Sequence, residues 1–141
     1  MSLNTLRSYI EGRIATEFAG DPALQVAYEN VPFTPPNNAS WVQTAILWGD
    51  SAYATLIKDN VTNGGRDRRN GVLTFNVFTP RGAGPGAGLT ISQRCIDLFS
   101  RLTLQNIIFD AANGPRTIEA PAPEGFFQTQ VTISFSAFEE S

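Results

Sequence analysis

The chain has 141 residues, a length typical of one domain, and its 42% hydrophobic and 16% charged content is typical of a globular protein. Its net charge of −3 gives no general basic footprint for nucleic acid, and its apolar runs are too short to cross a bilayer. The absence of histidine and the single cysteine, Cys95, exclude histidine-dependent triads and an internal disulfide, and leave too few ligands for zinc or iron–sulfur sites. We therefore expect no cofactor and no metal, and a buried, unreactive Cys95.

The first predicted element is an amphipathic helix over residues 3–18. Its apolar residues recur at spacings of three or four and form one stripe: Leu3, Leu6, Ile10, Ile14 and Phe18. A short strand is predicted at 24–30. Residues 31–40 are predicted to be extended, because three prolines there remove backbone donors. Phe33 lies in this stretch as an apolar anchor on a loop.

Two strands are predicted next, at 41–48 and 53–58, with a turn at Gly49-Asp50-Ser51 between them. Residues 59–70 (DNVTNGGRDRRN) are then expected to form a polar loop that links two strands. The strand at 71–80 places its apolar residues on one face at a period of two.

A glycine-rich loop at 81–88 (RGAGPGAG) is expected next, because its glycines carry high conformational entropy. A second amphipathic helix is predicted to begin at Leu89, where Thr90 and Gln93 fit a capping box.

The C-terminal part of the chain predicts a short strand at 104–110 and a turn-rich connection with three prolines at 111–125. Residues 126–138 alternate apolar and polar side chains, which predicts a long strand with one wet face. Because most neighbouring strands are joined by hairpins, we expect one α+β domain over residues 1–141. Its sheet is predicted to be mostly antiparallel, with two helices packed on one face and a long C-terminal strand.

The glycine loop admits a second interpretation, a nucleotide-binding enzyme. Gly82, Gly84 and Ala87 match the G-x-G-x-x-G/A pattern, and Asp110 stands near where a ribose ligand is expected. That pattern needs parallel βαβ units, which the rest of the chain does not predict. Pro85 also interrupts the N–H groups that would bind a pyrophosphate. A connector whose small residues let another subunit approach closely is the simpler interpretation.

Positive charge gathers in the 59–70 segment, in Arg66, Arg68 and Arg69. Arginine forks bind DNA phosphates and the carboxylates of protein partners, so both contacts are open to this cluster. Asp59 and Asp67 partly neutralise it, so a solvated hairpin tip is the simpler alternative.

Several stretches of the chain together carry a resemblance to a known family. They are 28–36 (YENVPFTPP), Trp41-Val42, Arg69-Asn70-Gly71 at the opening of a strand that ends in 77–80 (VFTP), the glycine loop with its following helix, and the first helix. Together they resemble the small tail terminator (tail completion) proteins of long-tailed bacteriophages, relatives of the lambda-type terminator. The resemblance implies a virion structural protein and not an enzyme. It also implies a ring, usually a hexamer, that stops polymerisation of the tail tube and gives the head-side connector a surface to join.

The implied partners are further copies of the chain, the tail tube protein and a head-side connector or neck protein. Phage DNA would pass through the lumen without specific binding, and no membrane is involved. The protein would lie in the tail or neck of the virion, after assembly in the bacterial cytoplasm. No catalytic residue is implied. A head–tail joining or neck adaptor protein is the alternative within the same class.

Two devices for assembly follow from this resemblance. The strand at 126–138 is expected to extend a sheet across subunits, and the segment around Arg66 to reach a neighbour or the tube. The candidate assembly contacts are Phe33, Arg66, Arg68, Arg69 and Arg81.

Overall fold

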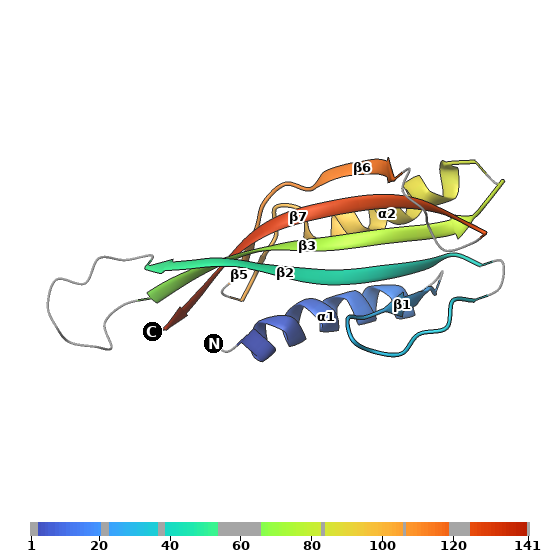
Figure 1. Ribbon diagram of the computed structural model, residues 1–141. Coiled ribbons are helices and arrows are strands. Elements are labelled where there is room, and N and C mark those ends of the chain that lie inside the picture. Colours follow the sequence, from blue (N-terminus) through green and yellow to red (C-terminus); the bar gives the residue numbers. More distant parts are fainter. Residues whose placement is uncertain are drawn as a thin grey trace, which may run out of the picture.

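The structure is a computed structural model that describes residues 3–20, 23–36, 39–53, 66–82, 84–105, 107–118 and 125–140, with backbone alone at 50–53, 66–68 and 138–140. Its elements are α1 (Leu3–Ala19), β1 (Gln25–Ala27), β2 (Trp41–Tyr53), β3 (Arg66–Pro80), α2 (Gly86–Phe99), β4 (Thr103–Leu104), β5 (Ile107–Phe109), β6 (Asn113–Ile118) and β7 (Phe126–Glu140). Three long strands dominate the shape, and they run nearly the full length of the molecule (Figure 1).

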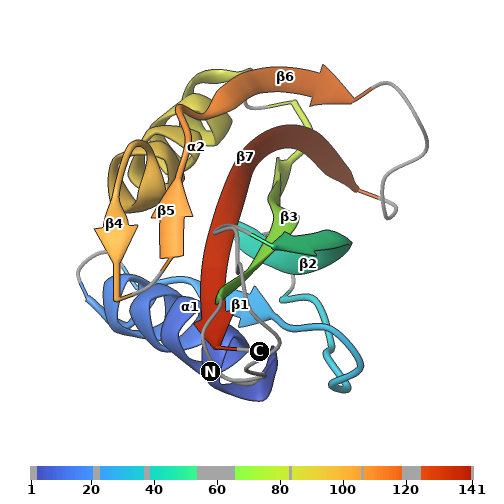
Figure 2. The same ribbon diagram turned by 90° about the vertical axis from the view of Figure 1, so that its left-hand side faces the viewer.

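The strands form one mixed sheet in the order β1-β2-β3-β7-β5-β4, and β6 also pairs with β7. β3 pairs with β7 in an unbroken antiparallel register from Arg66–Glu140 to Pro80–Phe126. Only β1 pairs in parallel, with the start of β2. The α1 and α2 helices and the β4–β5 hairpin lie on one side of the long strands (Figure 2). The predicted α+β class, the mostly antiparallel sheet and the long C-terminal strand are confirmed.

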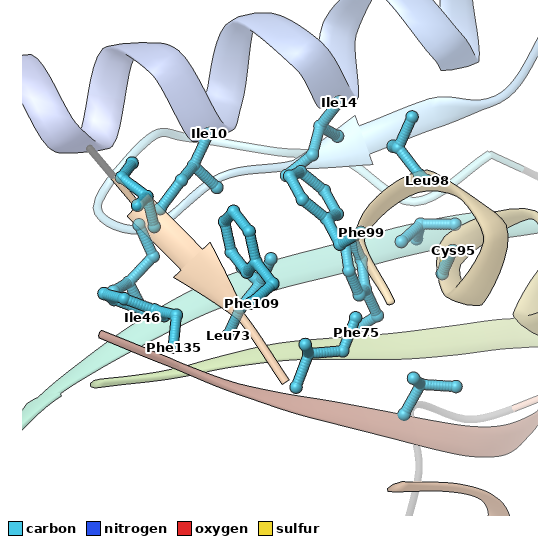
Figure 3. Close-up of a cluster of buried hydrophobic side chains, with 14 of the residues drawn as sticks. Ile10, Ile14, Ile46, Leu73, Phe75, Cys95, Leu98, Phe99, Phe109 and Phe135 are labelled. Atoms are coloured by element: carbon cyan, nitrogen blue, oxygen red, sulfur yellow. The ribbon is translucent and has the colours of Figure 1, made fainter. Parts of the chain in front are cut away.

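The core lies between the inner face of the sheet and the two helices (Figure 3). All of the predicted α1 stripe except Leu3 is buried, because a 3.6-residue period turns those side chains toward the sheet. A continuous run of aromatic rings crosses the core from Phe75 through Phe99 and Phe109 to Phe135, with ring centroids 5.9, 4.9 and 5.7 Å apart. This run joins α2, the β4–β5 hairpin and the long strands into one packed unit.

Two arginines join α1 to α2. Arg94 of α2 donates from Nε to the Glu17 carboxylate at 3.0 Å and from a terminal nitrogen to the Glu17 carbonyl at 3.0 Å. Its guanidinium carbon lies 4.7 Å from the centroid of the Phe18 ring. Arg13 of α1 donates to the carbonyl of Leu98, in the last turn of α2, at 2.9 Å. A cation there complements the partial negative charge at the C-terminal end of the helix.

Two sequence predictions around β2 and β3 are wrong. No turn forms at Gly49-Asp50-Ser51. β2 continues through these residues to Tyr53, and its pairing with β3 shifts at a bulge between Trp48 and Ser51. The expected 59–70 loop is strand from Arg66 onward, because the backbone there pairs with β2 on one side and β7 on the other. The predicted strand residues 54–58 and the loop residues 59–65 lie outside the described residues.

The start of α2 also differs from its prediction. The helix begins at Gly86, so the loop is shorter than predicted, and the N-cap residue Pro85 makes no side-chain cap hydrogen bond. Thr90 donates to the Gly86 carbonyl and Gln93 donates to Asp97, so neither residue forms the expected capping box. Packing explains Gly88, the second glycine of this first turn, whereas a Cβ at Gly86 would meet no atom within 4 Å. A Cβ at Gly88 would lie 2.9 Å from Thr129 Oγ1, so only glycine lets the helix approach β7 this closely.

The turn-rich connection predicted at 111–125 contains a strand. β6 pairs with β7 over Asn113–Ile118 although its side chains are almost all exposed, so no apolar alternation marks it in the sequence. Two other boundaries differ. The strand expected at 24–30 is limited to Gln25–Ala27, and the 104–110 segment belongs to a small hairpin of β4 and β5.

Candidate assembly surfaces

The outer face of the sheet, opposite the helices, carries an aromatic cluster at one end. Trp41 of β2 stacks on Phe78 of β3 with ring centroids 4.3 Å apart and meets Phe126 of β7 edge-on at 5.9 Å. Phe33 is half-buried and packs on Trp41 with its ring centroid 4.9 Å away. Phe33 therefore fixes the extended stretch after β1 onto this face, and much of its ring is already covered by its own chain.

A groove of about 620 Å³ runs between the segment 27–35 and the start of β2. On the β2 side it is lined by Trp41, Gln43, Thr44 and Ala45, so it extends past the point where β1 stops pairing. Next to it, Ile46 lies on the edge of β2 that β1 leaves unpaired. There the Glu29 carboxylate accepts a hydrogen bond from the backbone N–H of Ile46 at 2.8 Å. Two buried polar atoms of β2 have no hydrogen-bond partner among the described residues. Trp41 Nε1 lies on the outer face with Phe78, and Thr44 Oγ1 lies on the inner face with its cross-strand partner Phe75. The groove thus combines apolar walls with one buried donor, Trp41 Nε1, that the described chain leaves unused.

Three candidate arginines lie together at one end of β3. Arg66 pairs through its backbone with Glu140 of β7, and Arg69 pairs with Ser51 of β2 and Ala137 of β7. Arg68 lies between them in the same ladder, and Arg69 is half-buried. The ladder on both sides places the backbone of this cluster in the sheet, where the sequence analysis expected a loop.

Arg81 lies at the opposite end of β3. Its backbone N–H donates to the Gly125 carbonyl at 3.0 Å, and the residue is exposed. It borders a pocket of about 510 Å³ that Gly82, Gly84 and Phe127 also line. The 15 residues of β3 span about 45 Å of extended strand, so the structure places Arg81 far from the other arginines. The predicted contact residues therefore fall in three separate places: the outer-face cluster and the two ends of β3.

The geometry does not fit the nucleotide-binding interpretation of the glycine loop. Both neighbours of β3 in the sheet are antiparallel to it, so the strand before this loop belongs to no parallel βαβ unit. The backbone N–H of Asp110, the expected ribose ligand, donates a hydrogen bond to the Ser134 carbonyl of β7 at 2.8 Å. The loop lies instead beside Gly125, nine residues from Ser134, which is about 30 Å along an extended strand.

Two titratable groups among the described residues have shifted pKa values. They are Cys95 in the core and Tyr28, which lies near Glu11 of α1. Burial raises the pKa of the Cys95 thiol to about 12, so the thiol is protonated at neutral pH. Burial and the nearby Glu11 carboxylate raise the pKa of Tyr28. In the described part of the chain, no group of three His, Cys, Asp or Glu residues is placed to hold a metal ion. Within the same residues, no helix is long and apolar enough to span a membrane.

Sequence reasoning missed the edge contact between Glu29 and Ile46. Glu29 belongs to the 28–36 stretch, but a single glutamate after a short strand does not indicate which backbone group it binds. The sequence analysis also expected the long C-terminal strand at 126–138 to extend a sheet across subunits. That prediction is wrong, because β7 is paired with β3 on one side and with β5 and β6 on the other. On the second side β5 and β6 cover the middle of β7, and its two ends stay unpaired among the described residues.

Comparison with known proteins connects this architecture to one family. A family model described as phage tail terminator protein matches residues 5–135. A comparison with curated protein sequences gives no match. Among solved structures, one protein that carries no descriptive name superposes with a TM-score of 0.68 and 19% sequence identity, over 97% of this chain and 96% of its own. At that identity the likeness concerns the fold alone.

Proposed function

This chain belongs to the phage tail terminator protein family, and we propose that it forms a ring, most simply a hexamer, that caps the tail tube and stops its polymerisation. The family's role is structural and lies in completing the phage tail. The ring then presents a surface to a head-side connector or neck protein, while DNA passes through its lumen without specific binding. The observation that carries this proposal is the family match over residues 5–135.

The shape of the subunit supports a two-sided ring. A terminator ring must bind the tube on one side and the head-side structure on the other, and β3 separates its two ends by about 45 Å. Arg66, Arg68 and Arg69 lie at one end and Arg81 at the other. We assign one end of the long strands to the tube and the opposite end to the neck. Assembly occurs in the bacterial cytoplasm, and the ring stays in the virion.

Tube assembly tests the proposal directly. Purified tail tube protein is allowed to polymerise with and without this protein, and tube lengths are measured by negative-stain electron microscopy. We expect shorter tubes of bounded length with a ring at one end. Tube lengths that do not change, together with binding to the head-side connector alone, would contradict the terminator role and indicate a neck adaptor.

The arginine cluster at the end of β3 is tested in the same assay. The triple variant Arg66→Ser, Arg68→Ser, Arg69→Ser is expected to weaken tube capping because it removes charge-assisted contacts at that end. The control removes two exposed arginines elsewhere, Arg7→Ser and Arg101→Ser, and is expected to cap normally. Circular dichroism checks the fold of both. Normal capping by the triple variant would show that these arginines at the end of β3 do not contribute to the contact with the tube.

A further inference from the structure

We propose that the open edge of β2, at residues 44–48, pairs with the exposed strand β6 of a second copy of this chain. The inference rests on the proposed ring for its biological setting, and it names the surfaces that join neighbouring subunits. β6 and the β1–β2 pair lie toward opposite margins of the sheet (Figure 2). A contact between two different edges is heterologous, and contacts of this kind close into rings by rotation.

The edge of β2 is open because β1 is short. β1 pairs only with Trp41, Val42 and Gln43, and the chain then leaves the sheet at Tyr28. On its other side β2 pairs with β3 as far as Tyr53. Within the described ranges, no strand follows β1 along this edge. An unpaired edge with its row of N–H and C=O groups is a template for another strand.

Glu29 occupies one position that such a strand would take. Its carboxylate accepts the Ile46 N–H at 2.8 Å, where the carbonyl of a paired strand would otherwise lie. A charge-assisted bond at this position shields the edge of the free subunit from indiscriminate pairing. The side chain thus acts as a removable cap on the edge.

The groove beside this edge has further unused capacity. Trp41 is only 4% exposed, yet its Nε1 has no partner in the described part of the chain. Buried polar atoms are seldom left unpaired in native structures, so this donor favours an occupant that brings a hydrogen-bond acceptor to Trp41. Val31, which lines the groove and is 55% exposed, and Leu47, which belongs to the open edge segment of β2 and is 70% exposed, offer apolar surface that association would bury.

β6 is the occupant that the described residues favour. Among the described residues it pairs with β7 on one edge alone, its residues 113–117 are all exposed, and it is longer than β4 at the other margin. Pro115 lacks an N–H, so pairing runs through Arg116–Thr117–Ile118. Arg116 is the only charged residue of β6, and its sign is opposite to that of Glu29. When β6 docks, its carbonyl replaces the Glu29 carboxylate at Ile46, and Glu29 pairs with Arg116 of the neighbouring copy.

Charge reversal tests the pairing. Glu29→Arg and Arg116→Glu are each expected to weaken self-association at least about tenfold, because each places like charges together, and the double variant is expected to recover most of the loss. Particle mass is measured by light scattering and mass photometry. The control Asp97→Arg reverses an exposed charge on α2 and is expected to assemble normally. Normal assembly by both single variants would overturn the inference.

Cross-linking gives a second measurement that does not depend on how the charge variants fold. Ala45→Cys and Thr117→Cys are made as separate chains, and Cys95 is buried and does not compete. We expect disulfide-linked dimers only when the two chains are mixed. Rings without this cross-link, or no self-association at all, would overturn the inference. Rings that cross-link as expected but leave tube lengths unchanged would contradict the proposed function and leave the edge pairing intact.

Discussion

The ring of Phe135 on β7 lies over the backbone of Gly71, its direct partner on β3. A Cβ added to Gly71 would lie 2.4 Å from Phe135 Cζ and 3.1 Å from the Leu47 carbonyl oxygen. The ring also meets Trp48 and Phe109, with centroids 5.9 and 5.7 Å away, so a shift of the ring would disturb both contacts. The missing side chain at Gly71 therefore makes room for an aromatic ring that joins the sheet to the β4–β5 hairpin.

The first prediction concerns this close contact. Gly71→Ala is expected to lower the free energy of unfolding by about 1–3 kcal/mol, because the new methyl group forces Phe135 or the strand to shift. The measurement is urea unfolding, with the slope of the transition compared between variants. The control is Gly12→Ala on α1, where no atom lies within 4 Å of the added Cβ. That change is expected to stabilise the protein by about 0.5–1 kcal/mol, because alanine favours helix. Equal effects of the two alanines would contradict the steric explanation.

The second prediction concerns the contact between the helices. Arg94→Lys keeps the charge but loses the paired bonds to Glu17 and the guanidinium contact with the Phe18 ring. We expect a loss of about 1 kcal/mol in the free energy of unfolding, measured by urea unfolding. The matched control is Arg7→Lys, where the arginine lies 3.6 Å from Glu11 on the surface of α1, and its effect should stay below about 0.5 kcal/mol. If both lysines had the same small effect, the geometry of the Arg94 contact would not contribute.

The third prediction is a pH dependence of stability from Cys95. Burial raises the pKa of this thiol from its ordinary value of 9.0 to about 12. The unfolded chain therefore loses the thiol proton at lower pH than the folded chain. Stability from this group is complete below pH 9.0 and falls as pH rises toward 12. The slope approaches about 1.4 kcal/mol per pH unit within that window.

Cys95→Ala isolates this effect from the other groups that titrate at high pH. The difference in unfolding free energy between the wild type and the variant is measured by urea titration from pH 8 upward, and we expect it to shrink as pH rises past about 9. In the folded protein the thiol is also expected to react with a thiol reagent only at the rate of unfolding. A difference that stays constant with pH would show that the thiol is not kept protonated by burial.

The fourth prediction separates the packing role of Phe33 from its proposed assembly role. Phe33→Ala removes a ring packed 4.9 Å from Trp41, and we expect a loss of about 1–2 kcal/mol from the isolated subunit. The fluorescence of Trp41, measured with Trp48→Phe to remove the second tryptophan, should shift to longer wavelength because the indole gains contact with water. An unchanged spectrum would mean that Phe33 does not shield Trp41.

The amino-acid sequence determined the features that repeat at a local period. The α1 stripe and the inward residues of β3 and β7 follow from spacings of 3.6 and 2, and they were predicted with the correct faces. They were sufficient for the α+β class and for the side of the sheet on which the helices pack. The alternation in β7 did not predict the environment of Phe126. This residue is buried with Trp41 on the outer face of the sheet, whereas the alternation marks only the residues that face the core.

The tertiary structure alone decided which strand edges are open and which residues meet across the sheet. β6 is a strand because it pairs with β7, although its exposed side chains show no alternation, and β7 is central because other strands cover both of its edges. The helical glycine at position 88 and the Glu29 bond to Ile46 depend in the same way on groups distant in the chain. A strand's hydrogen bonds go to residues far away in sequence, whereas a helix satisfies its own. The edges on which the proposed subunit contact depends therefore have no signature in local sequence.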